Sequence, residues 1–205
     1  QENITFYSNQ TGLPSQFGYS NARSMILLST GLYAPPGEQV YATMSSDLID
    51  SGALLQVGVH SDTLWHKSTI YRFPSIVRSF AIESANISIA NAFGGPIYLA
   101  VPPEGPLGST WINFDGAVNA PKYEHGETTS SDWQSIRDYP APWAEVSSDQ
   151  FIMSVPSSEI RTLDNPEDLM DFWEQALEME HDLYGFTPWP RIERAVFDVQ
   201  ISAGW

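Results

Sequence analysis

Short hydrophobic runs, each bounded by Pro, Gly, Asn or Ser, recur along the first two thirds of the chain. Several alternate apolar and polar positions or are rich in β-branched residues, which is typical of β-strands. Ala34–Gly37 separates the first two runs and has turn chemistry, because Pro fixes φ and Gly supplies a positive φ. Many short strands with turns between them predict a jelly-roll-like β-sandwich. The predicted strands are residues 24–33, with a bend at Gly31, and residues 39–44, 54–59, 76–82, 87–89, 97–101 and 111–114.

The pattern changes after about residue 120, and the clearest helix of the sequence lies in this second part. Residues 166–184 carry apolar side chains near helical spacing, with Pro166 in the first turn and Gly185 as the C-terminal stop. The aromatic stripe of this helix predicts core packing rather than a cofactor site. Two further strands are predicted, at 151–155 and in the final run from Ala195 to Trp205.

These elements predict a mainly β chain in three parts. Residues 1–23 are polar and read as an extended lead-in, and residues 24–142 form the β-sandwich accessory domain. Residues 143–205 form a small α/β piece. Because the last strand stops on Trp205, we interpret this piece as an incomplete domain.

Composition excludes several classes of partner and chemistry. The net charge is −16, from 9 Lys and Arg against 25 Asp and Glu, so the surface repels nucleic acid and anionic membranes. The chain has no cysteine, which excludes disulfides, thiol catalysis and thiolate metal sites. No apolar run reaches the length of a membrane span.

Three sequons, at Asn3, Asn9 and Asn86, are candidate N-glycosylation sites. Short sequons also arise by chance. The alternative is a secreted glycoprotein, with Gln1 as the start of a chain from which a signal peptide has been removed.

The four histidines, at positions 60, 66, 125 and 181, match no standard metal motif. None is followed by Glu, so no His-Glu-x-x-His zinc helix occurs. His60, Asp62 and His66 lie across a loop without ligand spacing, and we interpret them as surface loop residues. We therefore assign no catalytic residue, no metal site and no cofactor to these 205 residues.

Exposed tryptophans on a β-sandwich are able to stack on sugars, and four are candidates for glycan binding: Trp65, Trp111, Trp133 and Trp143. The competing interpretation is that they are buried, as most Trp side chains are.

Five segments, taken together and in order, resemble the enhancin-like, mucin-degrading zinc metallopeptidases of peptidase family M60. They are Thr30–Glu38, Phe93–Leu99, Ala141–Glu145, Val155–Ser157 and Phe197–Trp205. The resemblance implies a β-sandwich accessory part followed by the beginning of a gluzincin-type catalytic domain. It also implies a secreted or surface-attached protein that acts on glycoproteins such as mucins, although some relatives are partners of membrane proteins.

In that family the zinc ligands come after the point that corresponds to Trp205, so zinc is expected only with that C-terminal part. We therefore expect this chain alone to be inactive as a peptidase. The competing function is a non-catalytic module, a β-sandwich that binds glycans or proteins.

The resemblance also implies that the final segment lies at the edge of the substrate cleft, with Gln200, Ser202, Gly204 and Trp205 as its residues. Strand addition needs free backbone groups and small neighbouring side chains. The alternative is an interior strand with Ile201 and Trp205 in the core. In either case we expect residues 195–205 to be covered by a C-terminal fragment of the same precursor or by an oligomer mate.

Overall fold

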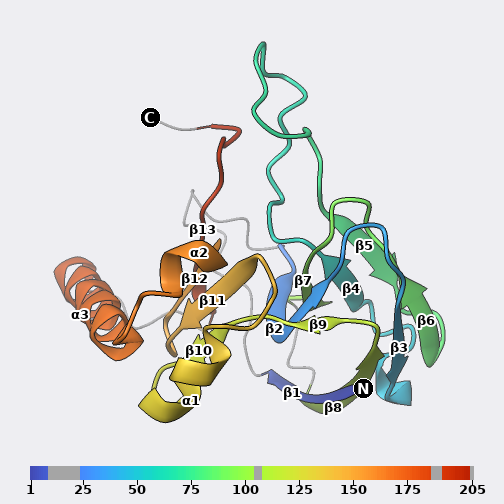
Figure 1. Cartoon of the computed structure of the whole chain (residues 1–205), viewed down its shortest axis with the longest axis horizontal. Coiled ribbons are helices and arrows are strands. Elements are labelled where there is room, and N and C mark those ends of the chain that lie inside the picture. The colour runs from blue at the N-terminus through green and yellow to red at the C-terminus, as the bar shows by residue number, and fades with distance from the viewer. Residues whose placement is uncertain (9–23, 104–107, 186–190, 204–205) are drawn as a thin grey trace.

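The computed structural model describes residues 1–8, 24–103, 108–185 and 191–203, which form three β-sheets and a small number of helices (Figure 1). Two sheets pack face to face as an N-terminal sandwich, and the third sheet carries the helices of a second part. The prediction of a mainly β chain with a sandwich followed by an α/β piece is confirmed.

The first sheet of the sandwich contains β1 at the edge next to β8, and all its pairings are antiparallel. β1 pairs along its full length with β8, so these residues belong to the sandwich and not to a lead-in outside it. Residues 9–23 lie outside the described part of the chain. In sheet order the strands are β1 (Glu2–Ser8), β8 (Gly108–Asp115), β3 (Val40–Met44) and β6 (Asn86–Ile89).

The second sheet has β7 at its centre and is also antiparallel. The predicted bend at Gly31 is present: the glycine has φ +70°, and the pairing register shifts between Ser29 and Tyr33. In sheet order the strands are β5 (Arg78–Ala81), β4 (Leu54–Val57), β7 (Gly95–Val101), β2 (Ile26–Ala34) and β9 (Val118–Asn119).

Gly94 and Gly95, at the start of β7, allow two backbones to approach closely. A Cβ on Gly95 would lie 2.6 Å from the amide nitrogen of Gly58, and one on Gly94 would lie 2.7 Å from the carbonyl oxygen of Ala34. Both glycines also have positive φ. This crowding explains why the Phe93–Pro96 segment needs two glycines. The close contact of Gly95 with Gly58 also lies at the end of β4, where the following loop leaves the sheet.

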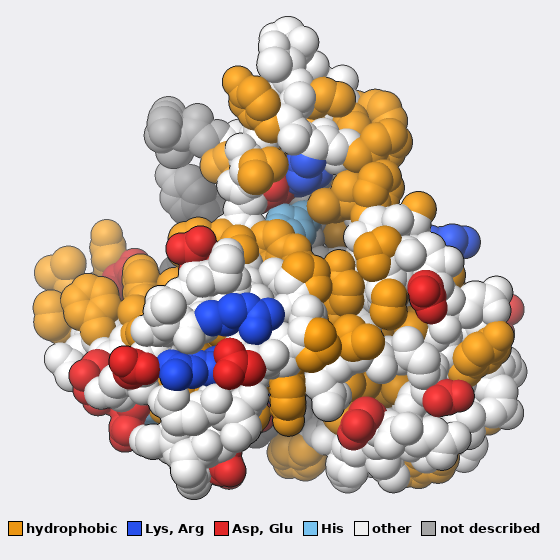
Figure 2. Space-filling model, viewed as in Figure 1, with side chains coloured by type: hydrophobic (Ala, Val, Ile, Leu, Met, Phe, Trp, Pro, Cys, Tyr) orange, Lys and Arg blue, Asp and Glu red, His pale blue; other side chains and the backbone are white. Residues whose placement is uncertain are grey.

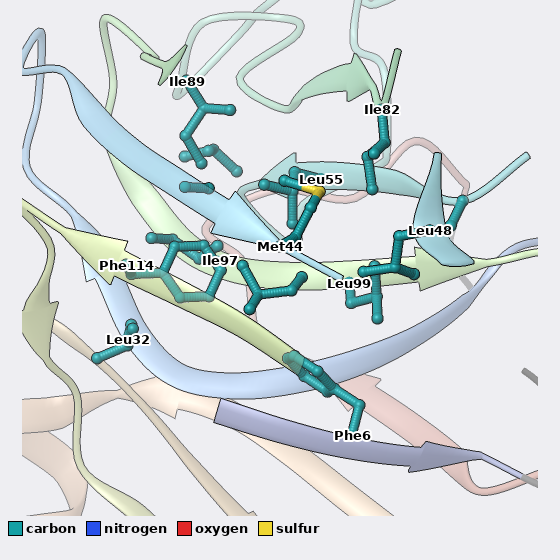
Figure 3. Packing of buried hydrophobic residues seen from close by; sticks show 14 of the residues in the cluster. Phe6, Leu32, Met44, Leu48, Leu55, Ile82, Ile89, Ile97, Leu99 and Phe114 are labelled. Atoms are coloured by element: carbon teal, nitrogen blue, oxygen red, sulfur yellow. The ribbon is translucent and has the colours of Figure 1, made fainter. Parts of the chain in front are cut away.

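The core of the sandwich lies between its two sheets (Figure 3). β3 and β8 alternate buried and exposed positions, as expected for sheets with one wet face. β7 is instead buried at every position. Ile97, Leu99 and Val101 point into the sandwich core, whereas the hydroxyl of Tyr98 reaches the second part of the protein.

The third sheet has the order β10-β11-β12-β13 and begins before the boundary predicted at residue 143. β10 pairs in parallel with β11. The preceding strand, β9, pairs with β2 and therefore belongs to the sandwich. The second part therefore starts near Lys122, because β10 finds its partner in β11. The strands are β10 (Lys122–Glu124), β11 (Trp143–Ser147), β12 (Phe151–Pro156) and β13 (Glu193–Val196).

The helices of the second part are α1 (Ser130–Ile136), α2 (Ser157–Ile160) and α3 (Pro166–Tyr184), and a 3₁₀ turn (Ser46–Leu48) lies in the sandwich. The helix predicted at 166–184 is confirmed, with Pro166 in its first turn and Gly185 in the left-handed conformation at its end. Trp173 of α3 stacks on Phe151 with ring centroids 4.6 Å apart, which supports the interpretation of the aromatic stripe as packing.

A buried polar cluster joins the sandwich to the third sheet. Glu145 of β11 pairs with Arg194 of β13 and accepts hydrogen bonds from the hydroxyls of Tyr98 at 2.8 Å and Ser154 at 2.9 Å. Arg194 also donates to the carbonyl oxygen of Leu27 in β2 at 3.2 Å. Burial by itself raises the pKa of Glu145, but Arg194 and the hydroxyl donors outweigh it and lower that pKa below its usual value.

The final strand is shorter than predicted. β13 ends at Val196, and residues 197–203, hereafter the tail, leave the sheet without pairing as a strand. The prediction of a strand continuing through the described tail is wrong, because its side chains and backbone groups bind a loop of the sandwich instead of a neighbouring strand.

Candidate functional site

The tail lies against a long loop between β4 and β5, residues 58–77, hereafter the β4–β5 loop. This loop projects from the sandwich as the tallest part of the view in Figure 1, with the tail rising near it. Leu64 and Pro74 are buried within the loop, and the amide of Leu64 donates to the carbonyl oxygen of Pro74 at 3.0 Å. The loop therefore has a small core of its own, which holds its two arms together.

Arg72 of the loop and Asp198 of the tail form the central contact between them. The Nε of Arg72 lies 2.9 and 2.8 Å from the two carboxylate oxygens, and an Nη2 atom lies 2.6 Å from one of them. The side chains are only 10% and 6% exposed. Burial raises the pKa of Asp198, but the hydrogen bond from Arg72 and the nearby positive charge outweigh it, and the pKa is lowered below its usual value.

Polar side chains of the loop fix the end of the tail. Asp62 accepts hydrogen bonds from the amide of Ser202 at 2.6 Å and from its hydroxyl at 2.8 Å. The Nε2 of His66 donates to the carbonyl oxygen of Ser202 at 3.1 Å. Gln200 contacts the other arm, accepting from the amide of Tyr71 and donating to the carbonyl oxygen of Thr69.

His60 lies at the base of the loop and joins three segments of the protein. Its side chain is buried, its Nε2 donates to the carbonyl oxygen of Phe197 at 2.9 Å, and its ring meets the edge of Trp143 at a centroid distance of 4.4 Å. Burial lowers the pKa of His60, which outweighs the opposing effects of the Phe197 carbonyl and of Asp198. The neutral ring is therefore the form that fits this position.

The residues His60, Asp62 and His66, expected to be ordinary surface loop residues, thus all bind the tail. They do not converge on a common point, so the structure offers no metal site among them within the described part of the chain. No local signal in the sequence predicts this role, because the partners are more than 130 residues apart.

An apolar pocket of about 710 Å³ lies beside the tail. The tail lines it with Phe197 and Val199, and Trp143 lines it at the start of β11. Ile76 of the β4–β5 loop also lines it. The remaining apolar wall comes from β12, α2, the α2–α3 connection and the start of α3: Met153, Val155, Pro156, Ile160, Leu163 and Leu169. A concave apolar surface bounded by a few polar groups, here His60 and Arg72, has the usual features of a binding site.

Alternate residues of the tail face in different directions. Asp198, Gln200 and Ser202 bind the β4–β5 loop, whereas the side chains of Val199 and Ile201 are 71% and 49% exposed. Among the described residues, no hydrogen bond engages the backbone of Val199 or Ile201. Gln200 and Ser202, predicted at the cleft edge, are anchoring residues here, and Gly204 and Trp205 lie outside the described part.

The four tryptophans proposed for glycan binding have different environments. Trp65 of the loop and Trp111 of β8 are 67% and 41% exposed. Trp143 is half-buried between the loop and the third sheet. Trp133 is fully buried, and its Nε1 donates to the carbonyl oxygen of Leu163 at 2.7 Å, so it is a core residue and not a sugar-stacking one.

Two of the predicted N-glycosylation residues are described, and both are exposed on strands. Asn3 lies on the edge strand β1, and Asn86 begins β6. The Oδ1 of Asn86 accepts a hydrogen bond from Thr43 at 2.8 Å. Asn9 lies outside the described residues.

Among the described residues, one group has donor atoms close enough together to hold a metal ion: His125 with Asp171 and Glu174 of α3. The Nε2 of His125 lies 2.9 Å from a carboxylate oxygen of Asp171, and its Nδ1 lies 3.9 Å from one of Glu174. The two carboxylates thus lie against different nitrogens of the ring, and these contacts link the segment that follows β10 to α3.

The fold is that of a β-sandwich joined to a small α/β part, and comparison with known families assigns both parts. The family described as "N-terminal domain of M60-like peptidases" matches residues 1–113, and "Peptidase M60, enhancin and enhancin-like" matches residues 116–205. The chain therefore belongs to the M60-like peptidase family, and the resemblance seen in its sequence is confirmed.

Curated relatives include TRPM8 channel-associated factor 1 from Homo sapiens, 36% identical over 181 residues, and a TRPM8 channel-associated factor homolog from Xenopus laevis, 38% identical over 179 residues. These matches cover 87% and 86% of this chain and 20% of each relative. The chain thus spans about one fifth of the length of these relatives. None of the helices in the described ranges combines the length and apolarity needed to cross a bilayer.

Solved structures share the fold at low sequence identity. A conserved protein of unknown function from Bacillus anthracis has a TM-score of 0.71 at 15% identity, covering 95% of this chain and 41% of that one. The catalytic module of the metalloprotease ZmpA from Clostridium perfringens has a TM-score of 0.67 at 11% identity, covering 94% and 44%. The M60 catalytic domain of ZmpC from the same organism, in complex with the sialyl T antigen, has a TM-score of 0.63 at 14% identity, covering 90% and 40%.

Proposed function

We propose that this chain is the N-terminal portion of a secreted or extracellular M60-like zinc metallopeptidase that acts on glycoproteins such as mucins. The observation that carries the proposal is the tandem match of the two family descriptions, joined in the structure by the Glu145–Arg194 cluster and by the tail. Two structural neighbours, ZmpC and IMPa, are described in complex with the sialyl T antigen and the T-antigen. These descriptions support a glycoprotein substrate.

Within this proposal the tail forms one edge of the substrate cleft. The backbone groups of Val199 and Ile201, which hydrogen-bond to none of the described residues, are suited to pair with an extended peptide, while Asp198, Gln200 and Ser202 hold the edge in place. The apolar pocket beside Phe197 and Val199 accepts either a substrate side chain or a segment of polypeptide that covers it. Such a segment would come from a C-terminal part of the same precursor or from an oligomer mate.

The residues present do not fit a catalytic zinc ion. The 205-residue sequence has no His-Glu-x-x-His, and in the His125 group among the described residues the carboxylates of Asp171 and Glu174 lie against different ring nitrogens. On this proposal the zinc ligands and the general base are supplied by sequence C-terminal to Trp205, as the family resemblance implies, and no catalytic step is assigned to the side chains described here.

The experiment that tests the proposal reads the coding sequence beyond Trp205 and assays the longer protein. A His-Glu-x-x-His motif there, together with cleavage of an O-glycosylated mucin that a chelator abolishes, is the expected result. Purified 1–205 alone should show no such cleavage. A longer protein without zinc ligands, or one that binds glycoproteins without cleaving them, would instead support the second function, a non-catalytic glycan- or protein-binding β-sandwich module.

A further inference from the structure

The β4–β5 loop carries a surface of exposed aromatic side chains that the contacts with the tail do not use. Trp65, Tyr71 and Phe73 are 67%, 73% and 51% exposed, and Phe93, at the turn before β7, is 44% exposed. We call these four residues the aromatic face. Figure 2 shows hydrophobic side chains gathered along the projecting part of the molecule. Exposed apolar side chains scattered singly are ordinary, but a contiguous group marks an interaction site.

Three of the four rings of the aromatic face are in contact with one another. Trp65 meets Phe73 edge to face at a centroid distance of 5.7 Å, and Phe73 packs at 5.0 Å against Phe93. Three rings thus form a continuous line from the loop to the sandwich. This line is held in place without burying the outer surface of Trp65, so the indole is presented to solvent in a fixed position.

The stretch of chain that carries Trp65, Tyr71 and Phe73 has more cationic than anionic residues, unlike the chain as a whole. Residues 59–82 contain three of the 9 Lys and Arg residues, Lys67, Arg72 and Arg78, but one of the 25 Asp and Glu residues, Asp62. Arg72 is neutralised by Asp198, whereas among the described residues no carboxylate forms an ion pair with Lys67 or Arg78. In a protein of net charge −16, this stretch together with the Asp198 that pairs with it carries three cationic side chains against two carboxylates, a small local excess of positive charge.

The tail holds the backbone of the aromatic face in one conformation. Arg72 lies between two residues of the aromatic face in sequence, Tyr71 and Phe73, and is held by Asp198. The amide of Tyr71 is held by Gln200 at 3.0 Å. A surface ordered before binding loses less entropy on binding, so the tail contacts favour recognition at the aromatic face.

We propose that the aromatic face is a glycan-binding site that selects acidic sugars. The electropositive C–H face of a pyranose ring packs on the outer face of Trp65, because the π face of an indole is negative. Lys67 supplies the charge for a sugar carboxylate, and the polar neighbours Ser68, Thr69 and the Tyr71 hydroxyl supply hydrogen-bonding groups. The choice of ligand class rests on the proposed function, since the site would engage the glycan of a glycoprotein bound along the tail.

The same observations disfavour a bilayer and a protein partner. In Figure 2 the upper end of the projecting part is mostly white, the colour of backbone and of uncharged polar side chains, and the hydrophobic side chains lie below it. A loop that inserts into a membrane would instead have its apolar side chains at this end. Along the loop, the exposed polar residues His66, Ser68 and Thr69 lie between Trp65 and Tyr71, so the surface is not the charge-depleted apolar core of a protein interface.

The test is a titration of isotopically labelled 1–205 with a sialylated O-glycopeptide, followed by NMR. The expected result is a shift of the Trp65 indole N–H signal on binding. Trp65→Ala should weaken binding by about tenfold or more, as for a central aromatic contact. Tyr41→Ala is the matched control, because Tyr41 is an exposed aromatic residue on β3 in the other sheet, and it should leave the affinity unchanged.

Further probes separate the parts of the proposal. Lys67→Glu should weaken binding of the sialylated glycopeptide by about fivefold or more and leave the desialylated one unaffected. Equal binding of the unglycosylated peptide, binding only to phosphatidylcholine vesicles, or no binding to any probe would overturn the glycan site. Equal affinity for both glycopeptides would overturn the acidic selectivity. None of these outcomes depends on peptidase activity, so failure of this site and failure of the proposed function are distinguishable.

Discussion

The guanidinium of Arg72 lies against both carboxylate oxygens of Asp198, across 126 residues of sequence, at distances of 2.6 to 2.9 Å. This pair fastens the tail of the second part to a loop of the sandwich. Both the proposed cleft edge and the aromatic face therefore depend on one buried ion pair.

Breaking this pair should release the tail. Arg72→Met keeps the apolar stem but leaves the Asp198 carboxylate buried without its cation, which should cost the closed state about 3–5 kcal/mol. Amide hydrogen exchange of Ser202, whose N–H donates to Asp62 at 2.6 Å, reports the closed state. The double variant Arg72→Met with Asp198→Asn should lose less than the sum of the single changes. Unchanged protection in Arg72→Met would contradict the role of the pair.

Acidification should destabilise the contact between the tail and the β4–β5 loop in two steps, one from His60 and one from Asp198. The pKa of His60 is lowered from 6.5, so the unfolded chain binds a proton at a higher pH than the folded one. The stability that neutral His60 confers is therefore complete above pH 6.5 and falls as the pH drops towards the folded pKa.

The second step comes from Asp198, whose pKa is lowered from 3.8. Its contribution is complete above that value and is lost as the pH falls through the folded pKa. Hydrogen exchange of the tail at pH 7.5 and about pH 5.5 tests the first step, after correction for the intrinsic pH dependence. His60→Gln keeps a donor for the Phe197 carbonyl and should remove that step; an unchanged pH profile in this variant would refute the assignment.

The Glu145–Arg194 pair should hold the two parts of the chain together. Glu145→Gln leaves Arg194, whose side chain is 13% exposed, without its counter-charge, and should lower the free energy of unfolding by about 3–5 kcal/mol. Adding Arg194→Met should recover part of the loss. Denaturant unfolding measures both changes.

The pH dependence of the same cluster follows from the lowered pKa of Glu145. Its stabilising contribution is complete above the usual carboxyl value of 4.5 and is lost as the pH falls below it. The stability difference between the wild type and Glu145→Gln should therefore shrink on acidification. A difference that grows at low pH would show that the cluster is not ionised in the folded protein.

Replacing Trp133 and Trp65 by Ala should lower the stability of the protein by very different amounts, because one ring is buried in the core and the other is exposed. Trp133→Ala removes a fully buried ring and should cost about 3–5 kcal/mol of unfolding free energy. Trp65→Ala removes an exposed ring and should change stability by only about 0.5 kcal/mol. Thermal or denaturant unfolding measures both, and a large loss for Trp65→Ala would mean that the aromatic face supports the fold.

Much of the architecture follows from local patterns in the sequence. The predicted strands of the sandwich, the bend at Gly31 and the helix Pro166–Tyr184 are all present, because alternation, turn residues and helix signals act over a few neighbouring positions. Strands β1 and β10 and the strand at Trp143–Ser147 were not predicted as strands, because they are short or polar and are stabilised by the partners with which they pair.

The sequence by itself determined the sandwich, the helix and the family, whose motifs lie in order along the chain. Only the tertiary structure decided that the final residues leave the sheet at Val196 and bind the β4–β5 loop. It also decided that Trp133 is buried while Trp65 is exposed. The physical reason is that burial and pairing between segments more than 100 residues apart depend on how the sheets pack, and no local pattern records that packing.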